Sequence, residues 1–153
     1  RLPVVVPDRI DDKCLAWLTN HRLQTVVVIH SNHANEIDRA VAAAMSKLQS
    51  TGITLLNQSV LLAGVNDRVG ALADLSEKLF SIGVLPYYIH LLDRVQGAAH
   101  FNVTKQQAQS LMGDLLTKLP GYLVPKLVSE QPGARSKVPV QPLVEEPQQS
   151  HKA

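Results

Sequence analysis

Short runs of aliphatic and β-branched residues alternate along the chain with longer segments in which apolar residues recur every three or four positions. The short runs are typical of strands and the longer segments of helices. We predict strands at residues 25–29, 53–56 with an extension over 60–62, 84–92 and 122–128, and the end of a further strand at 1–6. We predict helices at residues 35–48, 67–82 and 104–119, the last two capped by Asp67 and Thr104.

The predicted elements indicate an α/β fold. Strands whose apolar residues run continuously are usually buried on both faces, as in a parallel sheet covered by helices. No glycine-rich dinucleotide fingerprint follows a strand, which favours a barrel over an open doubly wound sheet. A closed barrel needs about eight strands, so the four or five predicted here indicate half of a TIM-type barrel. From residue 141 onward, repeated prolines and polar residues predict an extended or disordered tail.

Composition narrows the class of partner. The chain is 45% hydrophobic, and its 18% charged content is below the average of about 25%, which hints at surface normally covered by another body. Net charge is only +2 and no basic cluster is interleaved with aromatic residues, so a nucleic-acid partner has little support. No apolar run approaches the roughly 18 residues of a membrane span, and we expect a soluble cytoplasmic protein. The single cysteine, Cys14, excludes an internal disulfide and is expected to be a small buried hydrophobe.

Polar residues gather directly after each predicted strand. In a barrel, catalytic groups cluster where strands end, although helix capping alone accounts for about half of such residues. The candidates are His30, Asn32, His33, Asn35, Glu36, Asn57, Gln58, Ser59, His90, Asp93, Glu130 and Lys137.

Each candidate also has a plainer interpretation. His30 and His33 with Glu36 would make three metal ligands, but the H-E-x-x-H pattern is absent, so loop polarity or contact with a small ligand is favoured. Residues 57–59 would hydrogen-bond a phosphate or ribose, or form a turn. Glu130 and Lys137 considered alone are solvated side chains.

Four segments together resemble the lysine 2,3-aminomutase family. They are residues 29–37 (IHSNHANEI), 56–67 (LNQSVLLAGVND), 86–101 (PYYIH through HF) and 132–139 (PGARSKVP). Ala63 stands where the family usually has arginine. The resemblance covers residues 1–140 in order and is closest to the bacterial branch that makes β-lysine for modifying elongation factor P.

The resemblance implies a radical S-adenosylmethionine enzyme that uses a [4Fe–4S] cluster and pyridoxal phosphate on a partial (βα)6 barrel. Residues 1–128 would form the C-terminal half of that barrel, residues 129–140 the loop bearing the cofactor lysine, and residues 141–153 the tail. The implied reaction interconverts L-α-lysine and β-lysine by migration of the amino group from C2 to C3.

The resemblance also assigns roles to single residues. Lys137 matches the catalytic lysine that holds pyridoxal phosphate as a Schiff base, and the neutral amine needed for that bond is favoured in a closed site. Asp93 and Glu130 match two acids that bind the ε-ammonium of the substrate lysine; the family often has aspartate at the second position. Gln58 and Asn57 fall where cofactor contacts are expected.

The resemblance also implies a second cofactor and partners beyond this chain. His30 and His33 are placed on the S-adenosylmethionine side. The three-cysteine cluster motif of the family is missing, and Cys14 alone cannot supply three thiolates, so no metal ligand is assigned and the isolated chain is expected to be inactive. Its expected partners are L-lysine, a missing N-terminal half and, through an exposed sheet edge, further copies of itself.

Two alternative functions stay open. The first is an aminomutase for another amino acid such as glutamate, although Asp93 and Glu130 would repel the side-chain carboxylate of glutamate. The second is a non-enzymatic half-barrel that serves as an interaction module.

Overall fold

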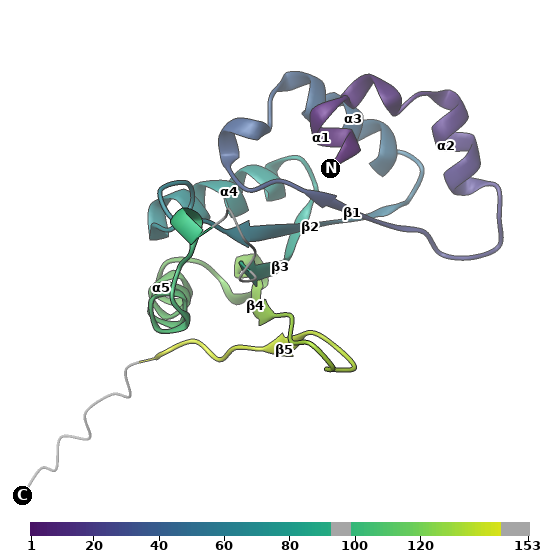
Figure 1. Ribbon diagram of the computed structural model, residues 1–153. Helices are drawn as coiled ribbons and strands as arrows, with labels where there is room; N and C mark the ends of the chain where they lie inside the picture. Colours follow the sequence, from purple (N-terminus) through teal and green to yellow (C-terminus); the bar gives the residue numbers. More distant parts are fainter. Residues whose placement is uncertain (93–98, 145–153) are drawn as a thin grey trace, which may run out of the picture.

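The computed structural model describes residues 1–92 and 99–144, which form a mostly parallel sheet with helices packed on it (Figure 1). The α-helices are α1 Leu2–Val5, α2 Asp12–Thr19, α3 Arg39–Gln49, α4 Val69–Ser81 and α5 Lys105–Lys118. The strands are β1 Val26–His30, β2 Thr54–Leu61, β3 Leu85–Leu91, β4 Lys126–Ser129 and β5 Val138–Pro139. Short 3-10 turns lie at Pro7–Arg9, Ala34–Glu36, Ala99–Phe101 and Gly121–Leu123. The predicted α/β class is confirmed.

The sheet has the order β1-β2-β3-β4-β5, so each strand pairs with its successor in the chain. The first four strands are parallel to one another, and helices α3, α4 and α5 occur between them in sequence. Parallel neighbours need such crossover connections, which explains the alternation seen in the hydrophobic pattern. β5 is antiparallel to β4 and was not predicted, because two residues ending in a proline give no strand pattern.

Helices α3, α4 and α5 cover one face of the sheet (Figure 1). Burial alternates strictly along β2, where Leu55 and Leu61 are buried and Leu56 and Val60 on the opposite face are only half-buried. Val26 on β1 keeps 49% of its surface exposed. The expectation that both faces are buried is therefore wrong for the described residues. The strands are apolar on both sides, but only one side meets helices.

Two clusters of buried side chains fill the space between the sheet and its helices. The first surrounds Ile29, Met45 and Leu48 between β1 and α3, and Cys14 on α2 packs against its edge. The second surrounds Ile89 on β3 and Met112 on α5, among others. Burying an aliphatic side chain contributes about 1.5–3 kcal/mol, so these clusters fix the strands that present the candidate site.

Three local predictions are wrong. Residues 1–6 contain helix α1 instead of a strand, since Pro3 in the first turn has the backbone angle that a helix start requires. Helix α4 begins at Val69 with Arg68 as its N-cap, so Asp67 does not cap it. Strand β4 begins only at Lys126, because a 3-10 turn and Pro125 precede it.

The predicted start of the last helix is confirmed. The Thr104 hydroxyl accepts a hydrogen bond from Gln107 N, and the Gln107 side chain accepts one from Thr104 N, which completes a capping box for α5.

The segment that follows β5 lies against α5. The Leu143 amide donates to the carbonyl of Gln109 at 3.0 Å, and Gln109 Nε2 donates to the carbonyl of Gln141 at 2.8 Å. The predicted tail is thus irregular but held at residues 141–144, and its remainder lies outside the described residues. Within the described ranges, no helix combines the length and apolarity that crossing a membrane requires.

Candidate active site

The parallel registers bring the carboxyl ends of the first four strands to one edge of the sheet. His30 at the end of β1 is paired with Gln58, and Val60 on β2 with His90 on β3. These side chains surround a cavity of about 280 Å³. Its lining is completed by Leu91, Leu92, Glu130 and Lys137. The structure therefore brings together three of the predicted cofactor and substrate residues, His30, Gln58 and Glu130, with the predicted catalytic lysine.

Lys137 reaches this cavity through a hairpin. β4 and β5 pair Val128 with Pro139 and Ser129 with Val138, so Glu130 and Lys137 stand opposite each other at the end of the ladder. The loop between them turns at Gly133, whose φ of +84° favours glycine. Lys137 Nζ donates a hydrogen bond of 2.7 Å to Glu130 Oε1. Opposite charges directly across a ladder are a stabilising pair, and this one aims the amine at the cavity.

The ion pair sets the charge of the site. The Lys137 hydrogen bond, and then its positive charge, lower the pKa of the Glu130 carboxyl below its ordinary value. His90 Nδ1 lies 3.7 Å from the same carboxylate oxygen. Lys137 Nζ also lies 5.9 Å from the centre of the Tyr88 ring, a cation–π contact. Glu130 is therefore an ionised carboxylate at neutral pH, shared between a lysine and a histidine.

A hydrogen bond to Asn32 orients the His30 ring. The side-chain oxygen of Asn32 accepts a hydrogen bond from Val60 N at 2.9 Å. The same oxygen lies 3.1 Å from His30 Nε2 and can only accept a hydrogen bond, so Nε2 must be the donor and carry a proton. Burial lowers the pKa of His30, an effect that the Asn32 hydrogen bond partly opposes. The His30 ring therefore lines the cavity while its Nε2–H group is hydrogen-bonded to Asn32.

Two further buried asparagines, Asn57 and Asn66, fix the loops that carry these groups. Asn57 bonds both Ser31 N and Ser31 O through its side-chain amide, at 2.9 and 3.1 Å. Asn66 accepts from Leu62 N and donates to the carbonyls of Asn32 and Val60, each within 2.9 Å. Asn57 lies on the covered face of β2, whereas Gln58 lines the cavity. A direct contact between Asn57 and a cofactor stays a prediction; what the structure gives Asn57 is the positioning of the loop after β1.

His33 and Glu36 serve the same loop. His33 Nδ1 accepts from Asn35 N at 3.2 Å, and Glu36 Oε1 accepts from Asn32 N and His33 N at 2.8 and 3.1 Å. Both side chains are thus engaged with backbone amides, as in a capping box. His33 is not among the residues that line the cavity with His30, so its predicted contact with a cofactor stays a prediction.

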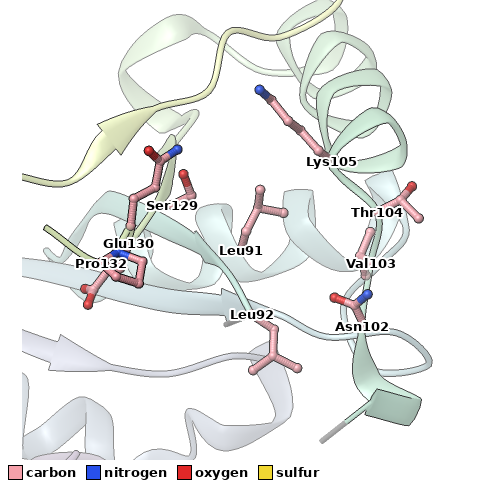
Figure 2. A pocket seen from close by; sticks show the side chains of 10 residues that line it. Leu91, Leu92, Asn102, Val103, Thr104, Lys105, Ser129, Glu130 and Pro132 are labelled. Carbon is pink, nitrogen blue, oxygen red and sulfur yellow. The ribbon is translucent and has the colours of Figure 1, made fainter. Parts of the chain in front are cut away.

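A larger cavity of about 800 Å³ adjoins the first. Figure 2 shows Glu130 and Pro132 on one side of it and Asn102 and Lys105 on the other. Glu130 lines both cavities and so stands between them. Asp93, the other predicted substrate acid, lies outside the described residues.

Tyr88 was missed by the sequence reasoning. Its ring contacts Lys137 and lies edge-on to His90, with ring centres 5.9 Å apart. The signal was present in the alternation of a strand, since residues two apart share a face and Tyr88 precedes the candidate His90 by two positions.

Comparison with known proteins gives a consistent result. The chain is 52% identical over 140 residues to the L-lysine 2,3-aminomutase of Escherichia coli, and 54% identical over 137 residues to that of Haemophilus influenzae. These alignments cover 92% and 90% of this chain but 41% and 40% of the relatives. The L-lysine 2,3-aminomutase of Clostridium subterminale is 38% identical over 142 residues, covering 93% of this chain and 34% of the relative.

No protein-family model matches the chain. The chain spans about two fifths of the length of the first relatives, and it does so at high identity over nearly its whole length. Over nearly its whole length the chain is therefore similar to one part of the L-lysine 2,3-aminomutases.

Proposed function

We propose that this chain is the part of an L-lysine 2,3-aminomutase that holds pyridoxal phosphate and the substrate ammonium. The observation that carries the proposal is the placement of the Lys137 amine, beside the Glu130 carboxylate and at a cavity formed by four strand ends. In this proposal residues 1–128 form half of a partial (βα)6 barrel, residues 129–140 the lysine loop, and residues 141–153 a tail. The five-stranded sheet with helices on one face supports it, because its open face would be the barrel interior.

The residues at the smaller cavity fit pyridoxal phosphate. Lys137 supplies a primary amine with 35% of its side chain exposed, which is enough for a ligand to reach. Gln58 and His30 supply polar groups on the adjacent strands. When bound, the cofactor supplies a conjugated ring that delocalises the unpaired electron during nitrogen migration. The task of this chain would be to hold the ring in place and to exclude water from it.

The substrate side chain would be recognised by charge. The ionised Glu130 offers a carboxylate to the ε-ammonium of L-lysine, and we propose Asp93 as the second carboxylate. A charge-assisted hydrogen bond of this kind is about twice as strong as a neutral one. A glutamate side chain would meet repulsion at Glu130, which argues against an aminomutase for that amino acid.

The other cofactors require residues that this chain does not supply. A [4Fe–4S] cluster needs three cysteine thiolates and Cys14 is the single cysteine of the sequence, so the cluster does not fit here. We propose that the cluster ligands belong to an N-terminal half, that S-adenosylmethionine contacts this chain on the side of His30 and His33, and that the chain alone does not catalyse the reaction.

The identities also support one branch of the family. They are 52% and 54% to the Escherichia coli and Haemophilus influenzae relatives, against 38% and 34% to those of Clostridium subterminale and Bacillus subtilis. This difference supports a role in supplying β-lysine to elongation factor P.

One observation favours a non-enzymatic alternative. Val26 and Val28 on the open face of β1 are 49% and 42% exposed, as expected of a module that covers a partner. Such a module would not need a lysine amine directed at a cavity. Binding of pyridoxal phosphate to Lys137 therefore distinguishes the aminomutase function from the interaction module.

The experiment is an absorbance titration of the 153-residue chain with pyridoxal phosphate at neutral pH. We expect the absorbance band of a lysine-bound cofactor to develop in the wild type and to be lost in Lys137→Ala. Lys78→Ala, which removes an exposed lysine from α4, is the control and should match the wild type. Equal spectra for all three proteins would refute the proposal and favour the interaction module.

A further inference from the structure

The carboxylate proposed for the substrate is already occupied by the protein itself. Glu130 Oε1 accepts the hydrogen bond of Lys137 Nζ at 2.7 Å. A lysine side chain ends in a primary ammonium on four methylene groups, which is the same chemical group as the side chain of the proposed substrate. Lys137 therefore fills the position at Glu130 that a substrate ammonium would take.

This pair is set by the hairpin. The register of β4 and β5 places residues 130 and 137 opposite each other, and the Tyr88 ring lies beneath the amine. His90 Nδ1, at 3.7 Å from Glu130 Oε1, faces the same oxygen. That oxygen already faces two cationic or polar groups, so an ammonium ligand that binds it competes with Lys137.

We infer that Lys137 competes with ammonium ligands for Glu130, so that cofactor-free protein masks its own substrate subsite. The inference rests on the proposed function and adds an order of binding to it. If Lys137 gave up its ammonium proton and condensed with the aldehyde of pyridoxal phosphate, with release of water, its ammonium would no longer neutralise Glu130, and the carboxylate would become available to the ε-ammonium of the substrate. By linkage, the two ligands then favour each other's binding.

The size of the effect follows from exposure. The Glu130 side chain is 57% exposed, so solvent screens its ion pair with Lys137 and the pair is weak. Removing Lys137 should therefore tighten the binding of an ammonium ligand by at most about fivefold.

The test is a titration of the whole chain with L-lysine, without cofactor, followed by the backbone amide NMR signals of residues 129–131. Lys137→Met keeps the stem of the side chain over Tyr88 and removes the charge. We expect it to bind L-lysine more tightly than the wild type, by up to about fivefold, because the exposed ion pair that it removes is weak. Lys126→Met, which removes a lysine from the start of the same strand, should bind as the wild type does.

Two further titrations define the outcome. L-norleucine, which replaces the ammonium by a methyl group, should show no difference between the wild type and Lys137→Met, and Glu130→Gln should lose the L-lysine response. Equal affinity of the wild type and Lys137→Met for L-lysine would overturn the inference, as would the absence of binding to either protein. Labelling of Lys137 by pyridoxal phosphate is measured separately, so the proposed function can stand when this inference falls.

Discussion

Single buried asparagines decide where the loops of the site lie. Asn66 is fully buried, and its side chain satisfies three backbone groups from two strand ends. A buried backbone group left without a partner costs about 1–3 kcal/mol.

We expect Asn66→Ala to lower the free energy of unfolding by about 3 kcal/mol, because one backbone amide and two backbone carbonyls next to the site would lose their hydrogen-bond partner. Asn35→Ala, at an exposed asparagine of the neighbouring turn, should change it by no more than about 0.5 kcal/mol. Urea unfolding of both variants measures the difference. Similar losses in the two would show that the Asn66 network does not organise these loops.

His30 should make stability depend on pH. Burial lowers its pKa below the ordinary value of 6.5, so the unfolded chain binds the proton more readily than the folded chain does. The stabilisation from the neutral ring is therefore complete above pH 6.5 and is lost as the pH falls from there toward the lowered pKa.

The corresponding variant is His30→Gln, which keeps a donor for Asn32 and does not titrate. Between pH 7.5 and pH 5.5 we expect the wild type to lose more thermal stability than His30→Gln, as measured by the midpoint of thermal unfolding. The other histidines are common to both proteins and cancel in the comparison. Parallel pH profiles would contradict the assignment of a neutral His30.

At the residue scale, the sequence predicted candidate residues better than their contacts. His30, Gln58 and Glu130 reach one cavity because residues near the carboxyl ends of parallel strands share an edge of the sheet, and the β4–β5 hairpin brings Lys137 to the same cavity. The pairing of Glu130 with Lys137 was not predicted, since it depends on a hairpin register that two residues of strand cannot reveal.

Elements with long periodic patterns were predicted well. β1, β3, α3, α4 and α5 lie within a few residues of their expected bounds, because many apolar positions specify each one. The failures are short elements whose form depends on tertiary contacts: helix α1, the late start of β4, and β5.

The contact between α5 and the tail gives a test at this scale. Gly113 on α5 is buried, and a methyl group added there would collide with the carbonyl oxygen of Leu143. We expect Gly113→Ala to displace residues 141–144, and so to raise the hydrogen-exchange rate of the Leu143 amide about tenfold or more, since it would lose its bond to Gln109.

Gly70 supplies the matched control. It is a helical glycine on α4 with open space where a methyl group would lie, so Gly70→Ala should leave the Leu143 amide protected. An unchanged exchange rate in Gly113→Ala would show that the tail does not depend on close approach to α5.

The molecule is asymmetric, because its helices lie on one face of the sheet (Figure 1). On the other face, the apolar side chains of Val26 and Val28 are partly exposed. Within the described residues, β1 pairs with β2 and with no other strand, so its outer edge is open. Sequence reasoning predicted a half-barrel, but not which face would be bare, since the strands are apolar on both sides.

This surface should drive self-association. We expect the wild-type chain to sediment as a mixture of oligomers, because an open edge beside exposed valines favours pairing of strands between copies. The double variant Val26→Thr/Val28→Thr should shift the distribution toward monomer. Val5→Thr, which alters an exposed valine on α1, should not. A sharp monomer boundary for the wild type would contradict this view of the open face.

The central claim is that Lys137 is the residue on which pyridoxal phosphate is held. Its most direct test is to incubate the chain with the cofactor, reduce with borohydride, digest, and locate the added mass by mass spectrometry. We expect the modification to concentrate on Lys137 at substoichiometric cofactor, and Glu130→Gln to change the rate of modification while leaving its position unchanged. Modification spread evenly over exposed lysines such as Lys78 and Lys126, with no preference for Lys137, would contradict it.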